Sequence, residues 1–325
     1  MISCTEFIPM YSEFFKFLEK RGGPDAVMKY WYYISDNSIG DKTNPHSLAY
    51  FADRLGGFEG AVAYWTHTLT EEACDMVRII DHKKKTYYEQ MRHCPSRGML
   101  NSLEHVEPYH NYCGHCNVIY SRVLEKYGMV YEMDFTDIEN ARCSSVLYEK
   151  GNPPGEGYDT ITGDKTVFDM KSEEAEYFHP DFHLLGDLAL KYCGEQYGDD
   201  AVTEFLTDFA RAYYSPLIAE IRAIGLSALK TWFETTYEKE HASDVISIKM
   251  NDAELAVTII RCPVIEYMHS LGQEPSKYYI QETTTLYDVI AREAGFCFSL
   301  DYYRDNGAAG FVFSPIRDVR NDEKR

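Results

Sequence analysis

The sequence has no apolar run of the roughly 18 residues that a membrane-spanning helix requires. Positive charge is also scarce: 32 Lys and Arg stand against 52 Asp and Glu, which gives a formal net charge of −20. No basic stripe is present to meet phosphate groups, and the one basic run, Lys83-Lys84-Lys85, is typical of a hairpin turn. We therefore expect a protein that binds neither nucleic acid nor a membrane, and we interpret the acidity as a source of solubility.

The first residues, Met1 to Glu6, lack the basic segment that opens a secretory signal. The chain has nine cysteines, an odd number. Without an export signal, an odd set indicates free thiols in a reducing compartment rather than a disulfide framework. We expect a cytoplasmic protein, and a homo-oligomer is left open.

The sequence repeats itself once, and repeats fix architecture. Three blocks align in order, the second and third at one constant offset of 167 residues: 23–27 with 198–202, 61–71 with 228–238, and 112–135 with 279–302. The alternative is two similar segments with coincident spacing. Because order and spacing are both kept, we interpret the chain as a tandem duplication.

Helix and strand periodicities give each copy the same order of elements. In the first copy we expect helices over 7–19, 24–33 and 47–68 (broken near Gly56-Gly57), a hairpin over 77–92, a helix over 109–127, and strands over 129–135 and 144–148. This order predicts an α+β unit of helices packed on a small antiparallel sheet. The division we expect is a first repeat over 1–150, a linker over 151–175, a second repeat over 176–316, and a charged tail over 317–325.

The two copies differ in their cysteines. Cys94, Cys113, Cys116 and Cys143 lie in the first copy, and the matching positions of the second read Cys262, Ile280, Thr283 and about Gly310. A fold that needed these thiols for stability alone would need them twice. The asymmetry therefore indicates function in the first copy and a degenerate second copy.

The segment 109–117 concentrates reactive side chains. On a helix, His110, Cys113 and Cys116 lie three residues apart and share a face, whereas His115 points elsewhere. Such thiols can serve catalysis or redox chemistry, can bind a metal together with imidazole, or can simply pack as small buried side chains. Cys143 would complete a tetrahedral set, although the second paired motif of a zinc ribbon is missing.

Cys94 lies at a junction of strand and helix, immediately before Pro95. The residue before a proline favours extended backbone, which suits a helix N-cap, and a thiol at that position gains thiolate character from the helix N-terminus. His93 is placed to act as base or cation, and Arg97, in the first turn, to bind a carboxylate. The other interpretation is structural, because the second copy keeps Cys262-Pro263.

These motifs resemble the L-2-amino-thiazoline-4-carboxylic acid hydrolase-like family. The likeness rests on His93-Cys94-Pro95 and its counterpart Arg261-Cys262-Pro263, followed by a helix with a downstream cysteine, a glycine and two closing strands. The resemblance implies a ligand pocket between helices and sheet. It also implies hydrolysis at a C–N bond of a small cyclic amidine that bears a carboxylate. The closing strands are also similar to the 4-vinyl-reductase-type small-molecule-binding domain, which implies cysteines that hold a metal.

Our hypothesis is a thiol-dependent hydrolase that needs no cofactor. The residues expected to act in catalysis are Cys94, Cys113, His115 and His93, and those expected to bind the substrate are Arg97 and Tyr112. The alternative is a metal-containing protein that binds or senses a small molecule. In that case zinc or iron would be held by His110, Cys113, Cys116 and Cys143.

Overall fold

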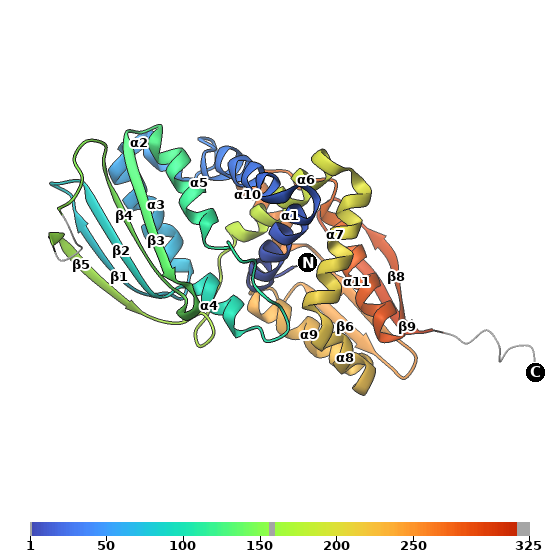
Figure 1. Ribbon diagram of the computed structural model, residues 1–325. Coiled ribbons are helices and arrows are strands. Elements are labelled where there is room, and N and C mark those ends of the chain that lie inside the picture. The colour runs from blue at the N-terminus through green and yellow to red at the C-terminus, as the bar shows by residue number, and fades with distance from the viewer. Residues whose placement is uncertain (1, 156–159, 317–325) are drawn as a thin grey trace, which may run out of the picture. The chain divides into compact units, whose positions relative to one another are not determined.

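The computed structural model describes residues 2–155 and 160–316, and the expected charged tail, 317–325, lies outside them (Figure 1). The chain combines helices with antiparallel sheets, so the α+β class is confirmed. Its contacts divide it into two compact units. We call Cys4–Leu188 the N-terminal unit, and Ala189 onward, with Ile2 and Ser3, the C-terminal unit.

The N-terminal unit places its helices against an antiparallel sheet (Figure 1). Its helices are α1 (Cys4–Ile34), the π-helical turn η1 (Ser35–Ile39), α2 (Leu48–Leu55), α3 (Gly57–Glu71), α4 (Pro95–Ser102), α5 (Gly114–Glu125), the short turn η2 (Ile138–Asn140) and the first half of α6 (Asp181–Tyr197). Its strands are β1 (Asp75–Asp81), β2 (Thr86–His93), β3 (Met129–Asp137), β4 (Arg142–Glu149) and β5 (Asp164–Asp169), in the sheet order β3-β4-β2-β1-β5.

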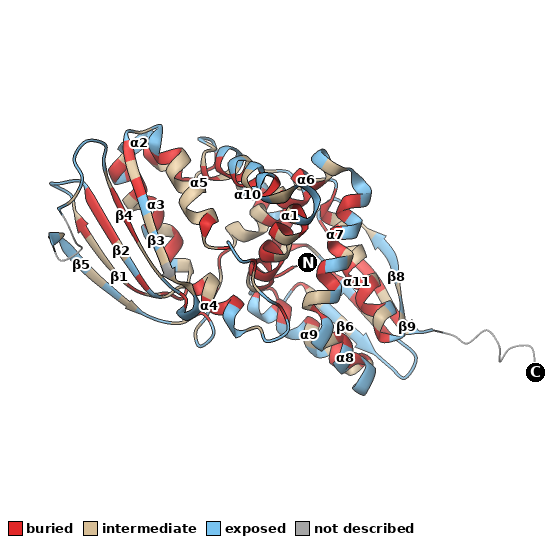
Figure 2. Cartoon of the chain, in the orientation of Figure 1, coloured by how far each residue is buried: buried red, intermediate tan, exposed pale blue. Residues whose placement is uncertain are grey.

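The predicted first two helices are joined in α1 across a break at Gly22 and Gly23. Gly23 has φ 68° and ψ −171°, a conformation that side chains disfavour, so the glycine permits the change of direction. Pro24 then restarts the helix, as expected from its fixed φ. On the first segment Phe14, Phe15 and Leu18 are fully buried, which confirms the predicted apolar face (Figure 2).

The C-terminal unit has its own antiparallel sheet. Its helices are the remainder of α6, α7 (Asp199–Tyr213), α8 (Ser215–Ile224), α9 (Leu226–Lys239), α10 (Pro263–Ser270) and α11 (Tyr279–Ala294). Its strands are β6 (Ile246–Met250), β7 (Leu255–Ile259), β8 (Phe296–Tyr303) and β9 (Ala309–Pro315), in the order β6-β7-β9-β8. The face of this sheet toward α9 and α11 is filled by aromatic rings, and Phe233, Tyr287, Phe311 and Phe313 are all in mutual ring contact.

Four strands of each unit are arranged in the same order. Read from the other edge, β8-β9-β7-β6 matches β3-β4-β2-β1. Met91 of β2 lies three residues before Cys94 and pairs with Cys143 of β4. Ile259 of β7 lies three residues before Cys262 and pairs with Ala309 of β9. The register therefore makes Ala309 the counterpart of Cys143, one residue from the Gly310 that the sequence predicted.

The helix expected over 109–127 begins later than predicted. Only α5 from Gly114 is helical, and the residues before it form turns. The Tyr109 N–H donates to Ser12 Oγ at 2.8 Å, and its hydroxyl donates to Glu19 at 2.9 Å. These bonds to α1 hold the segment away from the helix axis, a tertiary effect that periodicity does not reveal.

The expected linker over 151–175 contains β5, which pairs antiparallel with β1 along Asp75–Ile80. The N-terminal unit then continues to Leu188, inside α6, instead of ending at residue 150. The signal for β5 is weak, because its sequence, Asp164 to Asp169, is largely polar and exposed. Among the described helices, none has the combination of length and apolarity needed to cross a bilayer.

Candidate active site

A cavity of about 170 Å³ lies inside the N-terminal unit, between the sheet and the helices. Cys94, Cys113, Cys116 and Cys143 all line it, together with His115. A cavity of about 150 Å³ is large enough to hold benzene, so this one has room for a compound with a single ring. The structure therefore brings Cys94, Cys113, Cys116 and Cys143 to one cavity.

Three different elements deliver these thiols. Cys94 is the N-cap of α4, with extended φ −66° and ψ 127° before Pro95, as predicted. Cys113 caps α5, and Cys116 lies in the first turn of that helix. Cys143 comes from β4, opposite Met91 of β2. All four thiols are half-buried.

Burial determines the acidity of these thiols. It raises the pKa of Cys94 to about 12, although the backbone N–H groups of Arg97 and Ser96 lower it. It also raises the pKa of Cys113, Cys116 and Cys143. Burial therefore opposes the thiolate expected at the start of α4, because desolvation outweighs the effect of the helix N-terminus on the pKa of Cys94.

Arg97 is the cation of this cavity wall. Its Nε donates to the carbonyl of Ile138 at 3.2 Å, while Nη1 is buried without a hydrogen-bond partner among the described residues. The positive charge lowers the pKa of Cys113 and so opposes the effect of burial there. A buried guanidinium N–H with no partner is costly, and a carboxylate would satisfy it.

His115 is held as a neutral imidazole. Its Nδ1 donates to the carbonyl of Tyr112, which leaves the Nε2 lone pair facing Cys116 Sγ at 3.4 Å. Burial against the rings of Tyr11 and Phe15 lowers the pKa of His115 to about 4. Tyr112 itself is buried, lines the cavity and packs its ring on His115. His115 can accept a proton only briefly, and its direct partner is Cys116 rather than Cys113.

His93, by contrast, does not line this cavity. Its Nε2 is 2.9 Å from Glu173 Oε1, in the segment after β5. Neighbouring residues at a strand end point to opposite faces, so Cys94 and His93 separate. The expected proton transfer between them has no geometric support.

His110 is also separate from the thiols. Its side chain is 69% exposed and pairs with Glu19 of α1 at 3.1 Å. Because α5 begins only at Gly114, the shared helix face expected for His110, Cys113 and Cys116 does not form. Of the described His, Cys, Asp and Glu residues, the groups close enough to hold a metal include none of Cys113, Cys116 and Cys143. The predicted zinc or iron set is therefore not assembled.

Two carboxyl groups with a raised pKa line the cavity and were missed by the sequence analysis. Glu89, on β2, accepts a hydrogen bond from the Tyr87 hydroxyl at 2.8 Å, and burial raises its pKa to about 7. Burial also raises the pKa of Glu72, at the end of α3. A carboxyl with a pKa of about 7, like that of Glu89, exchanges protons readily near neutral pH. The available signal was the alternation along β2, which places Glu89 on the same face as Tyr87 and Met91, two buried residues.

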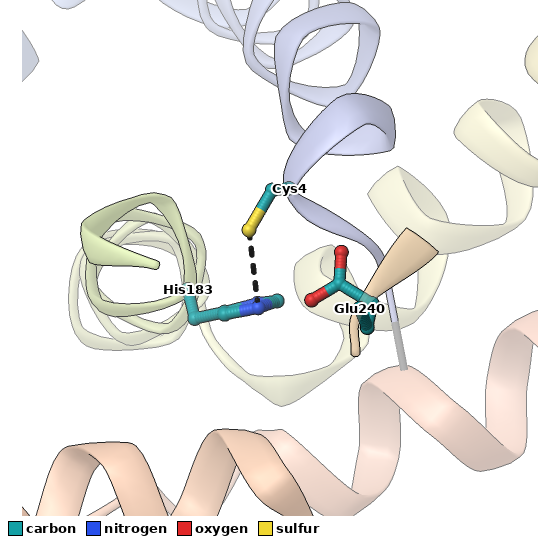
Figure 3. A group of neighbouring side chains, drawn as sticks. All are labelled: Cys4, His183 and Glu240. Carbon is teal, nitrogen blue, oxygen red and sulfur yellow. Dashed lines mark hydrogen bonds between the residues drawn. The ribbon is translucent and has the colours of Figure 1, made fainter. Parts of the chain in front are cut away.

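A further cysteine–histidine contact lies outside the cavity. Cys4 Sγ, at the start of α1, is 3.3 Å from His183 Nε2 of α6 (Figure 3). Cys4 is fully buried, and neither residue lines the cavity. Cysteine–histidine contacts in this unit are thus not confined to the segment that the sequence analysis emphasised.

Comparisons of the chain with protein-family models, with curated proteins and with solved structures find no match. The chemistry of the site must therefore be inferred from the cavity itself.

Proposed function

We propose that the N-terminal unit is a thiol-dependent hydrolase that acts on a C–N bond of a small, cyclic, carboxylate-bearing compound. The observation that carries the proposal is that Arg97 and Cys113 line one cavity and that the Arg97 charge acts on the Cys113 thiol. Arg97 offers a buried N–H with no partner, and Cys113 offers a thiol that the same cation makes more acidic. An anionic group and an electrophilic carbon in one ligand would match both.

The size and charge of the cavity define the substrate class. Its volume, about 170 Å³, suits a single ring with small substituents. Carboxyl groups at Glu72 and Glu89 border the same space as Arg97. A ligand with a carboxylate at one end and a basic nitrogen at the other complements that arrangement, and a cyclic amidine acid has this form.

The proposed reaction proceeds in two steps. The Cys113 sulfur forms a bond to the electrophilic carbon, the C–N bond breaks, and the nitrogen leaves with a proton. Water then adds to the same carbon, the C–S bond breaks, and the thiol recovers its proton. The net change is the addition of one water across the C–N bond.

Glu89 is our candidate for the proton transfers. With a pKa of about 7 it can donate to the leaving nitrogen and then accept from water. His115, with a pKa of about 4, is better suited to accept a hydrogen bond from the Cys116 thiol, which orients that part of the wall. Cys94 lies at the start of α4, where backbone N–H groups can hold a developing oxyanion.

We also infer that the two units arose by duplication and that the C-terminal one has lost the chemistry. The matching strand order and the Cys-Pro junction before α4 and α10 support this inference. Cys262 is buried, with its Sγ 2.9 Å from the Tyr279 hydroxyl. In this proposal the C-terminal unit contributes no residue to the reaction.

The test uses the full chain and a panel of cyclic amidine acids, including 2-amino-thiazoline-4-carboxylate. We expect the wild type to form product. Cys113→Ser should form none, and Cys262→Ser should form as much as the wild type. Replacing Arg97 with Gln should weaken binding of the turned-over compound about 100-fold, since a buried charge-assisted pair is worth about 3 kcal/mol. Undiminished turnover in Cys113→Ser would rule out the nucleophile.

A second candidate function is ligand binding without turnover, favoured by the raised pKa of all four cavity thiols. Calorimetry with the same panel separates the two. Saturable binding that Arg97→Gln removes, with no product from the wild type, would establish a binding protein and exclude the hydrolase.

A further inference from the structure

A second group of chemically competent side chains lies in the N-terminal unit. We call it the histidine–carboxylate cluster, and it consists of His46, His67, Glu71, His179 and Asp181. The first set of three consists of His46, His67 and Asp181, and the second of Glu71, His179 and Asp181. Within each set the nitrogen and oxygen atoms that could bind an ion lie within 4.8 Å of one another. No cysteine belongs to either set, although His46, His179 and Asp181 line the same cavity as the thiols.

Three elements of the same unit build the cluster. His67 and Glu71 lie one helical turn apart on α3 and so share a face. His46 comes from the turn before α2. The Phe178 N–H donates to the Glu71 carbonyl at 3.3 Å, which brings His179 and the start of α6 beside α3.

The spacing of the donor atoms suits an ion. His46 Nδ1 and Asp181 Oδ1 are 3.2 Å apart, and the donor atoms of His46, His67 and Asp181 all lie within 4.8 Å of one another. A tetrahedral ion with bonds of about 2.0–2.1 Å spaces its ligands by about 3.3 Å. Small side-chain movements would therefore bring these donors to coordination distance.

One atom of the cluster indicates a ligand directly. His67 Nε2 is buried and has no hydrogen-bond partner among the described residues. The ring of His67 packs edge-on against that of His46, with centroids 4.7 Å apart, which holds both imidazoles in place. A buried polar atom without a partner needs an explanation, and an ion on its lone pair provides one.

We propose that the cluster binds a divalent first-row transition metal ion through His46, His67 and Asp181. Two imidazoles and one carboxylate are a recurrent ligand set for iron(II), and zinc accepts the same atoms. The Glu71–His179 pair, with Oε2 and Nδ1 2.6 Å apart, would orient the ligands from the next shell out. His46 and Asp181 also line the cavity, so the ion would border the space in which a small molecule binds.

Cobalt(II) is the probe that distinguishes this site from the thiols. The full chain, stripped with a chelator and kept reduced, is titrated anaerobically with cobalt(II) and followed by absorption. Imidazole and carboxylate ligands give weak visible bands, whereas thiolate ligands add strong charge-transfer absorption in the near ultraviolet. We expect saturation at one equivalent without the thiolate bands.

Variants decide the assignment. His67→Gln and Asp181→Asn should weaken cobalt binding by at least about tenfold. His82→Gln is the matched control, because His82 pairs with Glu59 on the surface of the same unit and should bind cobalt as the wild type does. Since His67 Nε2 makes no hydrogen bond, its replacement should not unfold the unit, and an unchanged circular dichroism spectrum checks this. Absence of saturable binding, thiolate bands, or equal affinity in all variants would overturn the proposal, whatever the outcome of the hydrolase test.

Discussion

The two units share an order of strands but differ in what occupies the space between sheet and helices. In the N-terminal unit Cys113, Arg97 and Glu89 border a cavity. At the matching positions of the C-terminal unit stand Ile280, Ile265 and Val257. Ile265 and Val257 are buried. The comparison teaches that polar side chains border the cavity of the N-terminal unit at positions where the C-terminal unit has apolar ones.

The junction before α4 and α10 sharpens that comparison. Cys94 and Cys262 have nearly the same extended backbone and both precede proline. Cys94 is half-buried at the cavity, whereas Cys262 is 6% exposed and contacts the Tyr279 hydroxyl. The same local structure therefore serves both units, and the neighbours decide whether the thiol meets a ligand.

The largest expected effect comes from giving the N-terminal unit a residue of its counterpart. Cys113→Ile introduces the larger side chain found at Ile280 and should abolish binding of any compound that the cavity accepts. Overpacking should cost only about 1–3 kcal/mol of stability. Calorimetry measures the binding, and Ile280→Cys, which leaves the N-terminal unit intact, is the control. Wild-type affinity in Cys113→Ile would break the comparison.

The next effect concerns packing. Phe311, on β9, is 1% exposed and in ring contact with Phe233 and Tyr287, so Phe311→Ala should lower the free energy of unfolding by about 3–5 kcal/mol. By register its counterpart on β4 is Ser145, which pairs with Glu89 as Phe311 pairs with Val257. Ser145→Ala removes only a hydroxyl and should cost about 1 kcal/mol. Denaturant unfolding measures both, and equal costs would show that the two sheet faces are packed alike.

The third effect depends on pH. The folded-state pKa of Glu89, about 7, lies above its ordinary 4.5, so the folded protein holds a proton there that the unfolded chain releases. Stability therefore falls as pH rises from 4.5 to 7, and the loss is complete above that range. Glu89→Gln should remove it, a gain of at most about 3 kcal/mol at pH 8 that shrinks toward pH 5.

The matched control for this pH effect is Glu132→Gln on the exposed side of β3, measured by the same unfolding curves. If the effect of Glu89→Gln on stability varies with pH as that of Glu132→Gln does, the Glu89 carboxyl is solvated. Val257, the counterpart in the C-terminal unit, has no group to titrate.

The smallest effects are expected at surface ion pairs. Asp36 lies 2.6 Å from Arg122, and that guanidinium lowers the pKa of Asp36. Its contribution is present at neutral pH and is lost as acid protonates the carboxyl, so Asp36→Asn should cost less than about 1 kcal/mol and nothing at low pH. Asp244→Asn, beside Arg261 in the C-terminal unit, should matter less because Asp244 is 68% exposed. Thermal unfolding at two pH values would reveal a larger cost at either site.

Periodicity predicted most helices, the hairpin and the closing strands of the N-terminal unit, because local patterns determine them, but it predicted neither the late start of α5 nor strand β5. Comparison of the two halves of the sequence identified the four cysteines that reach the cavity. It could not place His93 and His110, whose directions depend on the separation of strand faces and on where α5 begins. Nor could it find Glu89 or the His46–Asp181 pair, because these are joined only by tertiary packing.

One consequence of the sheet order concerns how the chain can be divided. Strand β5 hydrogen-bonds along the whole of β1 from Asp75 to Ile80 and forms the edge of its sheet. A fragment that stopped at Glu149 would leave the N–H and C=O groups of β1 that face β5 without partners, and such an edge recruits strands from other molecules. A truncated chain meant to isolate the N-terminal unit should therefore extend through Leu188. We expect a shorter one to aggregate.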